Sequence, residues 1–160
     1  MDALIPIAER IAETLKARRQ TVAVAESSSG GLVSAALLAV PGASAYYQGG
    51  AVVYTGRARM QLMQLTREDV EGVRSASEPY ALILARAARD NFKTTWGISE
   101  TGAAGPGGNA YGDASGHTCV AVAGPDIELA LTVETGVDDR QANMRAFAQA
   151  VLELLERSLA

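Results

Sequence analysis

The amino-acid sequence predicts an α/β protein with a mixed, mostly parallel sheet that is covered by helices on both faces. Three observations lead to this fold class. Helical and strand patterns alternate along the chain, helical patterns lie at both ends, and the last two strand patterns are joined by a tight turn. Helices between strands imply parallel pairs, and the late hairpin adds an antiparallel pair. At 160 residues, we expect one domain over residues 1–160.

The first half of the chain contains two helical and two strand patterns. Residues 4–18 carry apolar side chains at helical spacing. The run Thr21–Ala25 is short, apolar and rich in β-branched residues, which indicates a buried strand. Ser28–Leu38 returns to helix formers, and a turn at Pro41–Ser44 leads to a second strand at Gly49–Tyr54.

The second half begins with a clear helix start. Ser77 is a good N-cap residue before Glu78 and Pro79, so we expect a helix that ends near Phe92. The later elements follow in chain order: a strand at Thr95–Thr101, a loop at Gly102–Gly116, a hairpin of Thr118–Ala123 and Glu128–Glu134 joined at Gly124–Asp126, and a final helix over residues 138–158.

Composition and charge exclude several classes of function. Apolar residues make up 48% and charged residues 20%, as in ordinary globular proteins. A formal net charge of -4 argues against broad electrostatic capture of nucleic acid. Cys119 and His117 are the only residues of their types, which excludes an internal disulfide and argues against a transition-metal site. We expect no metal and no cofactor.

The chain shows no targeting or membrane-spanning pattern. Asp2, Glu9 and Arg10 interrupt the start of the chain, where a signal peptide needs an apolar core. The longest apolar run, Ala35–Val40, is far shorter than the roughly 20 residues that cross a bilayer. We therefore expect a cytoplasmic protein without membrane contact.

The first candidate binding segment is Ala25–Gly31, where a buried strand runs into three serines, two glycines and a helix. Unpaired N–H groups at a helix start, with small side chains around them, allow an anion to approach. An N-cap cluster with tight helix–strand packing explains the pattern equally well. A carboxylate here would repel phosphate, so we expect Glu26 to bind a hydroxyl or to order a neighbour. The candidate residues are Glu26, Ser27, Ser28, Ser29, Gly30 and Gly31.

The second candidate segment is Thr101–Gly108, which has four glycines directly after a predicted strand. Such a backbone can fold over a ligand, and ligands of open α/β sheets bind beyond the carboxyl ends of strands. A flexible surface loop is the alternative. The candidate residues are Thr101, Gly102, Ala104 and Gly105.

The third segment, Pro41–Arg59, offers a nucleophile, a hydroxyl relay and a cationic partner in Ser44, Tyr54 and Arg59. A serine needs a base to attack a carbonyl, and arginine cannot supply one because it stays protonated. A turn serine and a core tyrosine are the structural alternative. His117 fits a general base and a structural residue equally well, and we assign it no role.

Together these motifs resemble the C-terminal domain of the CinA family. The family pattern A-E-S-C-T-G-G corresponds to Ala25–Gly31, P-G-S-S-x-x-F to Pro41–Tyr47, and G-x-V-x-Y-S-N-x-x-K to Gly50–Arg59. A V-S-E helix start is matched by Ala76–Glu78, and T-G-x-A-G-P by Thr101–Pro106. The five motifs agree in order and spacing over nearly the whole chain.

The resemblance implies a three-layer α/β/α fold and an amidohydrolase that acts in pyridine nucleotide recycling. Such enzymes convert the carboxamide of nicotinamide mononucleotide to the acid and release ammonia. The resemblance gives the role of nucleophile to Ser44, assisted by Tyr54 and by the residue at position 59, while the two Gly-rich turns would hold phosphate and ribose. It also implies a small-molecule nucleotide as the partner.

The chain departs from the family pattern at several positions. Ser28–Ser29 replace Cys-Thr, Gly56–Arg57 replace Asn and the residue after it, Gly107 replaces Asp, and Arg59 replaces the usual Lys. A catalytically weakened nucleotide-binding or sensing module is therefore a second interpretation, and hydrolysis of another phosphorylated amide a third. The terminal helices carry enough Leu, Ile and Val to cover the sheet. Any apolar surface beyond that need would favour self-association, and we expect a homodimer.

Overall fold

A mixed five-stranded sheet in the order β2-β1-β3-β4-β5 forms the centre of the protein. The computed structural model describes all of residues 1–160. The strands are β1 (Val22–Glu26), β2 (Tyr47–Val52), β3 (Trp96–Ala103), β4 (His117–Ala123) and β5 (Glu128–Glu134). Because β1 pairs in parallel with β2 and β3, and β4 is antiparallel to both β3 and β5, only β4 runs against the others. The mixed sheet expected from the sequence is confirmed.

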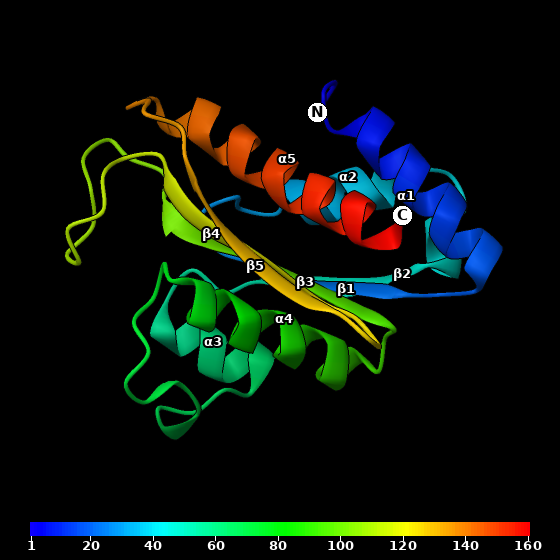
Figure 1. The fold of residues 1–160 in the computed structure, drawn as a ribbon, viewed down its shortest axis with the longest axis horizontal. Helices are drawn as coiled ribbons and strands as arrows, with labels where there is room; N and C mark the ends of the chain where they lie inside the picture. Colours follow the sequence, from blue (N-terminus) through cyan, green and yellow to red (C-terminus); the bar gives the residue numbers. More distant parts are fainter.

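Helices cover both faces of this sheet and form the outer layers (Figure 1). One face carries α1 (Ile5–Arg18), α2 (Leu32–Ala39) and α5 (Arg140–Leu159), and the other carries α3 (Gly56–Met63) and α4 (Glu78–Phe92). Two short 3-10 helices, η1 (Ala43–Ala45) and η2 (Glu68–Val70), lie in the connections. The three-layer α/β/α arrangement is thereby confirmed.

Alternation along β1 divides the core between the two helical layers. Val22 and Val24 belong to the cluster under α1, α2 and α5, whereas Ala23 and Ala25 belong to the cluster under α3 and α4. All five residues of β1 are buried, as expected of a central parallel strand. The small side chains on the second face let α4 lie close to the sheet.

Some element boundaries differ from the expectation in ways that matter for the site. Helix α2 begins at Leu32 rather than Ser28, because Gly30 and Gly31 adopt left-handed backbone angles, with φ of 65° and 97°. Strand β3 continues to Ala103, so Gly102 belongs to the sheet rather than to a loop. Helix α3 was not expected, since Met63 is its single buried residue and its apolar stripe is weak.

No helix of the protein combines the length and the apolar character that a membrane span requires.

Candidate functional site

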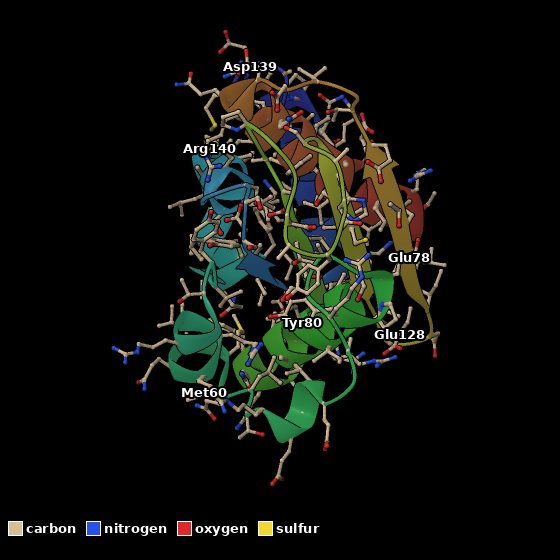
Figure 2. All side chains as sticks on the ribbon, turned by 90° about the vertical axis from the view of Figure 1, so that its left-hand side faces the viewer. Met60, Glu78, Tyr80, Glu128, Asp139 and Arg140 are labelled. Carbon is tan, nitrogen blue, oxygen red and sulfur yellow. The ribbon has the colours of Figure 1, made fainter.

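A polar pocket of about 500 Å³ lies at the carboxyl ends of β1, β2 and β3. Ser27 follows β1, Tyr54 and Arg59 follow β2, and Thr101 and Gly102 lie near the end of β3. The other lining residues are Val53, Thr55, Gly56, Ser75, Ala76, Tyr80, Asn109 and Tyr111. Figure 2 looks toward this edge of the molecule. Ligands of open α/β sheets bind at this edge.

The buried carboxylate of Glu100, on β3, occupies the turn that follows β1. Its Oε2 accepts the N–H groups of Ser27, at 3.1 Å, and Ser29, at 2.8 Å. Its Oε1 accepts the hydroxyl of Thr118, at 3.0 Å. Burial raises the pKa of Glu100, and these hydrogen bonds oppose that rise. The backbone donors that the sequence predicted for phosphate are therefore bonded to a carboxylate of the chain itself.

Glu26 performs the second half of this internal capping. Its Oε1 accepts the N–H of Val33, at 2.7 Å, and the hydroxyl of Ser29, at 3.0 Å, and its Oε2 accepts the N–H of Ser34, at 3.2 Å. A carboxylate at a helix start also interacts favourably with the helix dipole. Glu26 thus orders its neighbours in the chain, as the second of the two expectations for it stated, and the hydroxyl that it binds is that of Ser29.

Of the residues in the turn after β1, Ser27 is the one that lines the pocket. Ser28 is buried and its hydroxyl donates to the carbonyl of Gly102, at 2.6 Å. Ser29 is completely buried between the two carboxylates. This turn matches the N-cap interpretation of the sequence better than the phosphate-cradle interpretation, with glutamates in the capping role.

The second Gly-rich segment is divided between the pocket and its support. Thr101 and Gly102 line the pocket, and the Thr101 hydroxyl accepts the N–H of Ala76, at 3.2 Å. A side chain at Gly102 would collide with the carbonyl of His117, 2.5 Å from an added Cβ. Ala104 lies behind the pocket, where its carbonyl accepts the side-chain amide of Asn143.

Arg59 reaches the pocket from the first turns of α3. Thr55 caps this helix by accepting the N–H of Ala58, at 3.1 Å. The Nη1 of Arg59 donates to the hydroxyl of Tyr80, at 3.2 Å, and its guanidinium lies 5.9 Å from the centre of the Tyr80 ring. The Nε of Arg59 is buried and has no hydrogen-bond partner.

Arg140 links Tyr54 to the segment that follows β3. Its Nη2 donates to the hydroxyl of Tyr54, at 3.2 Å, and its Nη1 donates to the carbonyl of Gly105. Figure 2 shows Arg140 at the start of α5 and Tyr80 on α4, on different sides of this edge. Arg140 and Tyr80 were not predicted from the sequence, because neither lies in a motif and their places depend on long-range packing.

Ser44 does not meet its expected partners within the chain. It lies in η1, before β2 begins at Tyr47, and is exposed, whereas Tyr54 follows the carboxyl end of β2 at Val52. The six residues of β2 span about 20 Å. Ser44 is therefore at the opposite edge of the sheet, and the serine that shares the pocket with Tyr54 and Arg59 is Ser27.

His117 supports the pocket wall rather than facing the pocket. Its Nε2 donates to the carbonyl of Ala76, at 2.8 Å, and its Nδ1 bonds to the carboxylate of Glu134. Because both ring nitrogens face acceptors, the doubly protonated imidazolium fits best. Burial lowers the pKa of His117, but the hydrogen bonds to Glu134 and Ala76 and the charge of nearby Asp113 raise it overall.

This arrangement gives His117 a stabilising role that fades in alkaline solution. Its pKa in the folded chain lies above the unfolded value of 6.5, so the stabilisation is complete below that value and is lost as the pH rises through the folded pKa. We expect His117→Gln to lower the Tm more in mildly acidic than in alkaline buffer. Thermal unfolding of both proteins across this pH range measures the difference. A Tm difference that grows with pH would contradict the charged state.

A pocket at the carboxyl edge of a largely parallel sheet, lined by hydroxyls, backbone and arginine, suits a small polar ligand. No group of three or more His, Cys, Asp or Glu side chains is placed to hold a metal ion. The fold is that of a three-layer α/β/α domain with an open polar pocket at one edge of its sheet.

The chain belongs to the CinA C-terminal domain family, whose model matches residues 4–159. It is 38% identical over 120 residues to a CinA-like protein of Synechococcus sp. (strain RCC307), covering 75% of this chain and 29% of that protein. It is 33% identical over 148 residues to a CinA-like protein of Chlorobium limicola, covering 90% of this chain and 34% of that protein. The chain thus spans about a third of the length of these curated relatives.

Solved structures of the family have the same fold. A competence or damage-inducible protein from Enterobacter asburiae superposes with a TM-score of 0.91 at 26% identity, covering 98% of each chain. The competence/damage inducible protein CihA from Agrobacterium tumefaciens superposes with a TM-score of 0.89 at 27% identity, covering 98% of this chain and 94% of that one. The resemblance inferred from the motifs is confirmed.

Proposed function

We propose that this domain hydrolyses the carboxamide of nicotinamide mononucleotide to the acid and ammonia, with Ser27 as the nucleophile. The observation that carries the proposal is the position of Ser27: it lines the pocket with Tyr54 and Arg59, and its hydroxyl has no hydrogen-bond partner in the chain. Its N–H is held by Glu100, which fixes the backbone on which the hydroxyl stands. The choice of substrate rests on membership of the CinA family.

The residues of the pocket suit a two-step amide hydrolysis. The Ser27 oxygen adds to the amide carbon, the tetrahedral adduct expels ammonia, and water hydrolyses the resulting ester to the acid. The proton of the Ser27 hydroxyl passes, through the Tyr54 hydroxyl or a water molecule, to the amide nitrogen that leaves as ammonia, because Arg59 stays protonated and cannot accept it. The guanidinium of Arg59, which lines the pocket, stabilises the negative charge that develops on the carbonyl oxygen. Arg140 holds the Tyr54 hydroxyl in place.

Nucleotide binding without turnover is the second candidate function. The observation that favours it is Arg59, which stands where the family pattern has lysine and which cannot act as a general base. The same pocket would then sense or sequester the nucleotide. Hydrolysis of another phosphorylated amide is a third candidate, because it would need the same chemistry in this pocket.

An ammonia-release assay with nicotinamide mononucleotide, combined with thermal unfolding in its presence, distinguishes these functions. Hydrolysis predicts ammonia and acid in equal amounts, whereas binding alone predicts a higher Tm without ammonia. The absence of both ammonia release and thermal stabilisation would contradict both functions. A large gain of activity in Arg59→Lys would show that the arginine impairs the chemistry. The homodimer and the cytoplasmic location stay predictions. Measuring the oligomeric state in solution tests the homodimer.

A further inference from the structure

A second cavity, of about 700 Å³, opens beside the pocket along α3. We call it the arginine groove, and its lining residues are Gly56, Arg57, Arg59, Met60, Gln61 and Arg67. The groove shares Gly56 and Arg59 with the pocket that holds Ser27. A ligand whose reacting end lies at Ser27 can therefore extend past Arg59 into the groove.

The charge of the groove is positive and is not neutralised by the chain. Its three arginines take part in none of the ion pairs of the structure, and no acidic residue lines it. Elsewhere Arg74 and Arg86 pair with carboxylates. The chain as a whole has a net charge of -4, so this cluster is a local exception. Three unpaired guanidinium groups around one cavity favour an anionic ligand.

The backbone adds further donors in the same place. Thr55 satisfies the N–H groups of Ala58 and Arg59, but those of Gly56 and Arg57 donate to no group of the chain. They lie at the start of α3, where the helix dipole also favours negative charge.

The turn after β1 already holds a carboxylate of the chain, so an anionic ligand must bind elsewhere. Glu100 already accepts the N–H groups of Ser27 and Ser29, so a phosphate there would meet a carboxylate instead of free donors. The groove supplies guanidinium and N–H donors without a competing carboxylate. We propose that the arginine groove binds the phosphoryl group of the nucleotide whose amide end lies at Ser27. The amide end rests on the proposed function, whereas the phosphoryl subsite rests on the groove itself.

The test compares Arg57→Gln and Arg67→Gln with Arg18→Gln, which removes the same charge from the exposed end of α1 at the opposite edge of the sheet. A hydrogen bond between charged groups is worth enough to raise KM for nicotinamide mononucleotide about tenfold or more. We expect that rise in both groove variants and not in the control. Turnover of nicotinamide riboside, which lacks the phosphoryl group, should not change in the groove variants. An unchanged KM for the nucleotide would overturn the proposal.

Calorimetric titration with inorganic pyrophosphate and with phosphate tests anion binding in the groove independently of the proposed reaction. We expect the wild-type chain to bind these anions more weakly as salt increases, and the Arg57→Gln/Arg67→Gln double variant to lose the binding. That result would support the groove even if the wild-type chain released no ammonia. Absent binding in the wild type, or equal binding in the double variant, would reject it even if the amide is hydrolysed.

Discussion

Replacing Ser27 by alanine is expected to reduce ammonia release from nicotinamide mononucleotide by about 10³-fold or more, because the substitution removes the proposed nucleophile. The fold should not suffer. The hydroxyl of Ser27 has no partner in the chain, so its loss leaves no buried group unsatisfied, and the N–H that Glu100 accepts remains. We therefore expect an unchanged Tm together with the loss of kcat.

Ser44→Ala is the matched control for this experiment, since it removes the same hydroxyl from the other edge of the sheet. Ser44 is exposed in η1, and neither Tyr54 nor Arg59 is within its reach in one chain. We expect full activity. If Ser44→Ala abolished ammonia release while Ser27→Ala retained it, the nucleophile would be Ser44, and a second copy of the chain would have to bring it to the pocket.

The location of these two serines shows what the sequence could and could not predict. Once β1 and β2 are taken as parallel strands, a serine directly after β1 lies at the carboxyl edge and a serine before β2 lies at the amino edge. The sequence contained this information for Ser27 and Ser44. The resemblance to the family instead gave the role of nucleophile to Ser44, in the turn before β2.

The internal capping of the first turn could not be read from local sequence. Glu100 lies 71 residues after Ser29, and its position on β3 becomes meaningful only when β1 and β3 pair. Glu26 was recognised as unusual in an anion site, and its contacts with α2 explain why. Long-range packing also decides which donors remain free, and for that reason the arginine groove along α3 was not anticipated.

Glu100→Leu is expected to cause the largest loss of stability among the substitutions considered. The change leaves the buried N–H of Ser29 and the part-buried N–H of Ser27 without an acceptor, and a buried unsatisfied donor costs about 1–3 kcal/mol. For a chain of this size, each kcal/mol lowers the Tm by about 2–4 °C. Urea unfolding and calorimetry measure both quantities. Because the turn carries Ser27, we also expect kcat to fall in any Glu100→Leu protein that folds.

Glu100→Gln should be tolerated far better, and this contrast tests the hydrogen-bond explanation. The amide oxygen of glutamine can accept both N–H groups, while its NH₂ faces the hydroxyl of Thr118. That hydroxyl can turn to accept, since it already has the carbonyl of Thr101 as another partner for its proton, at 3.1 Å. Burial raises the pKa of Glu100, so the ionised carboxylate destabilises the fold at neutral pH, and glutamine removes that cost. If Gln and Leu destabilised the protein equally, the negative charge of Glu100 rather than its accepting oxygens would hold the turn.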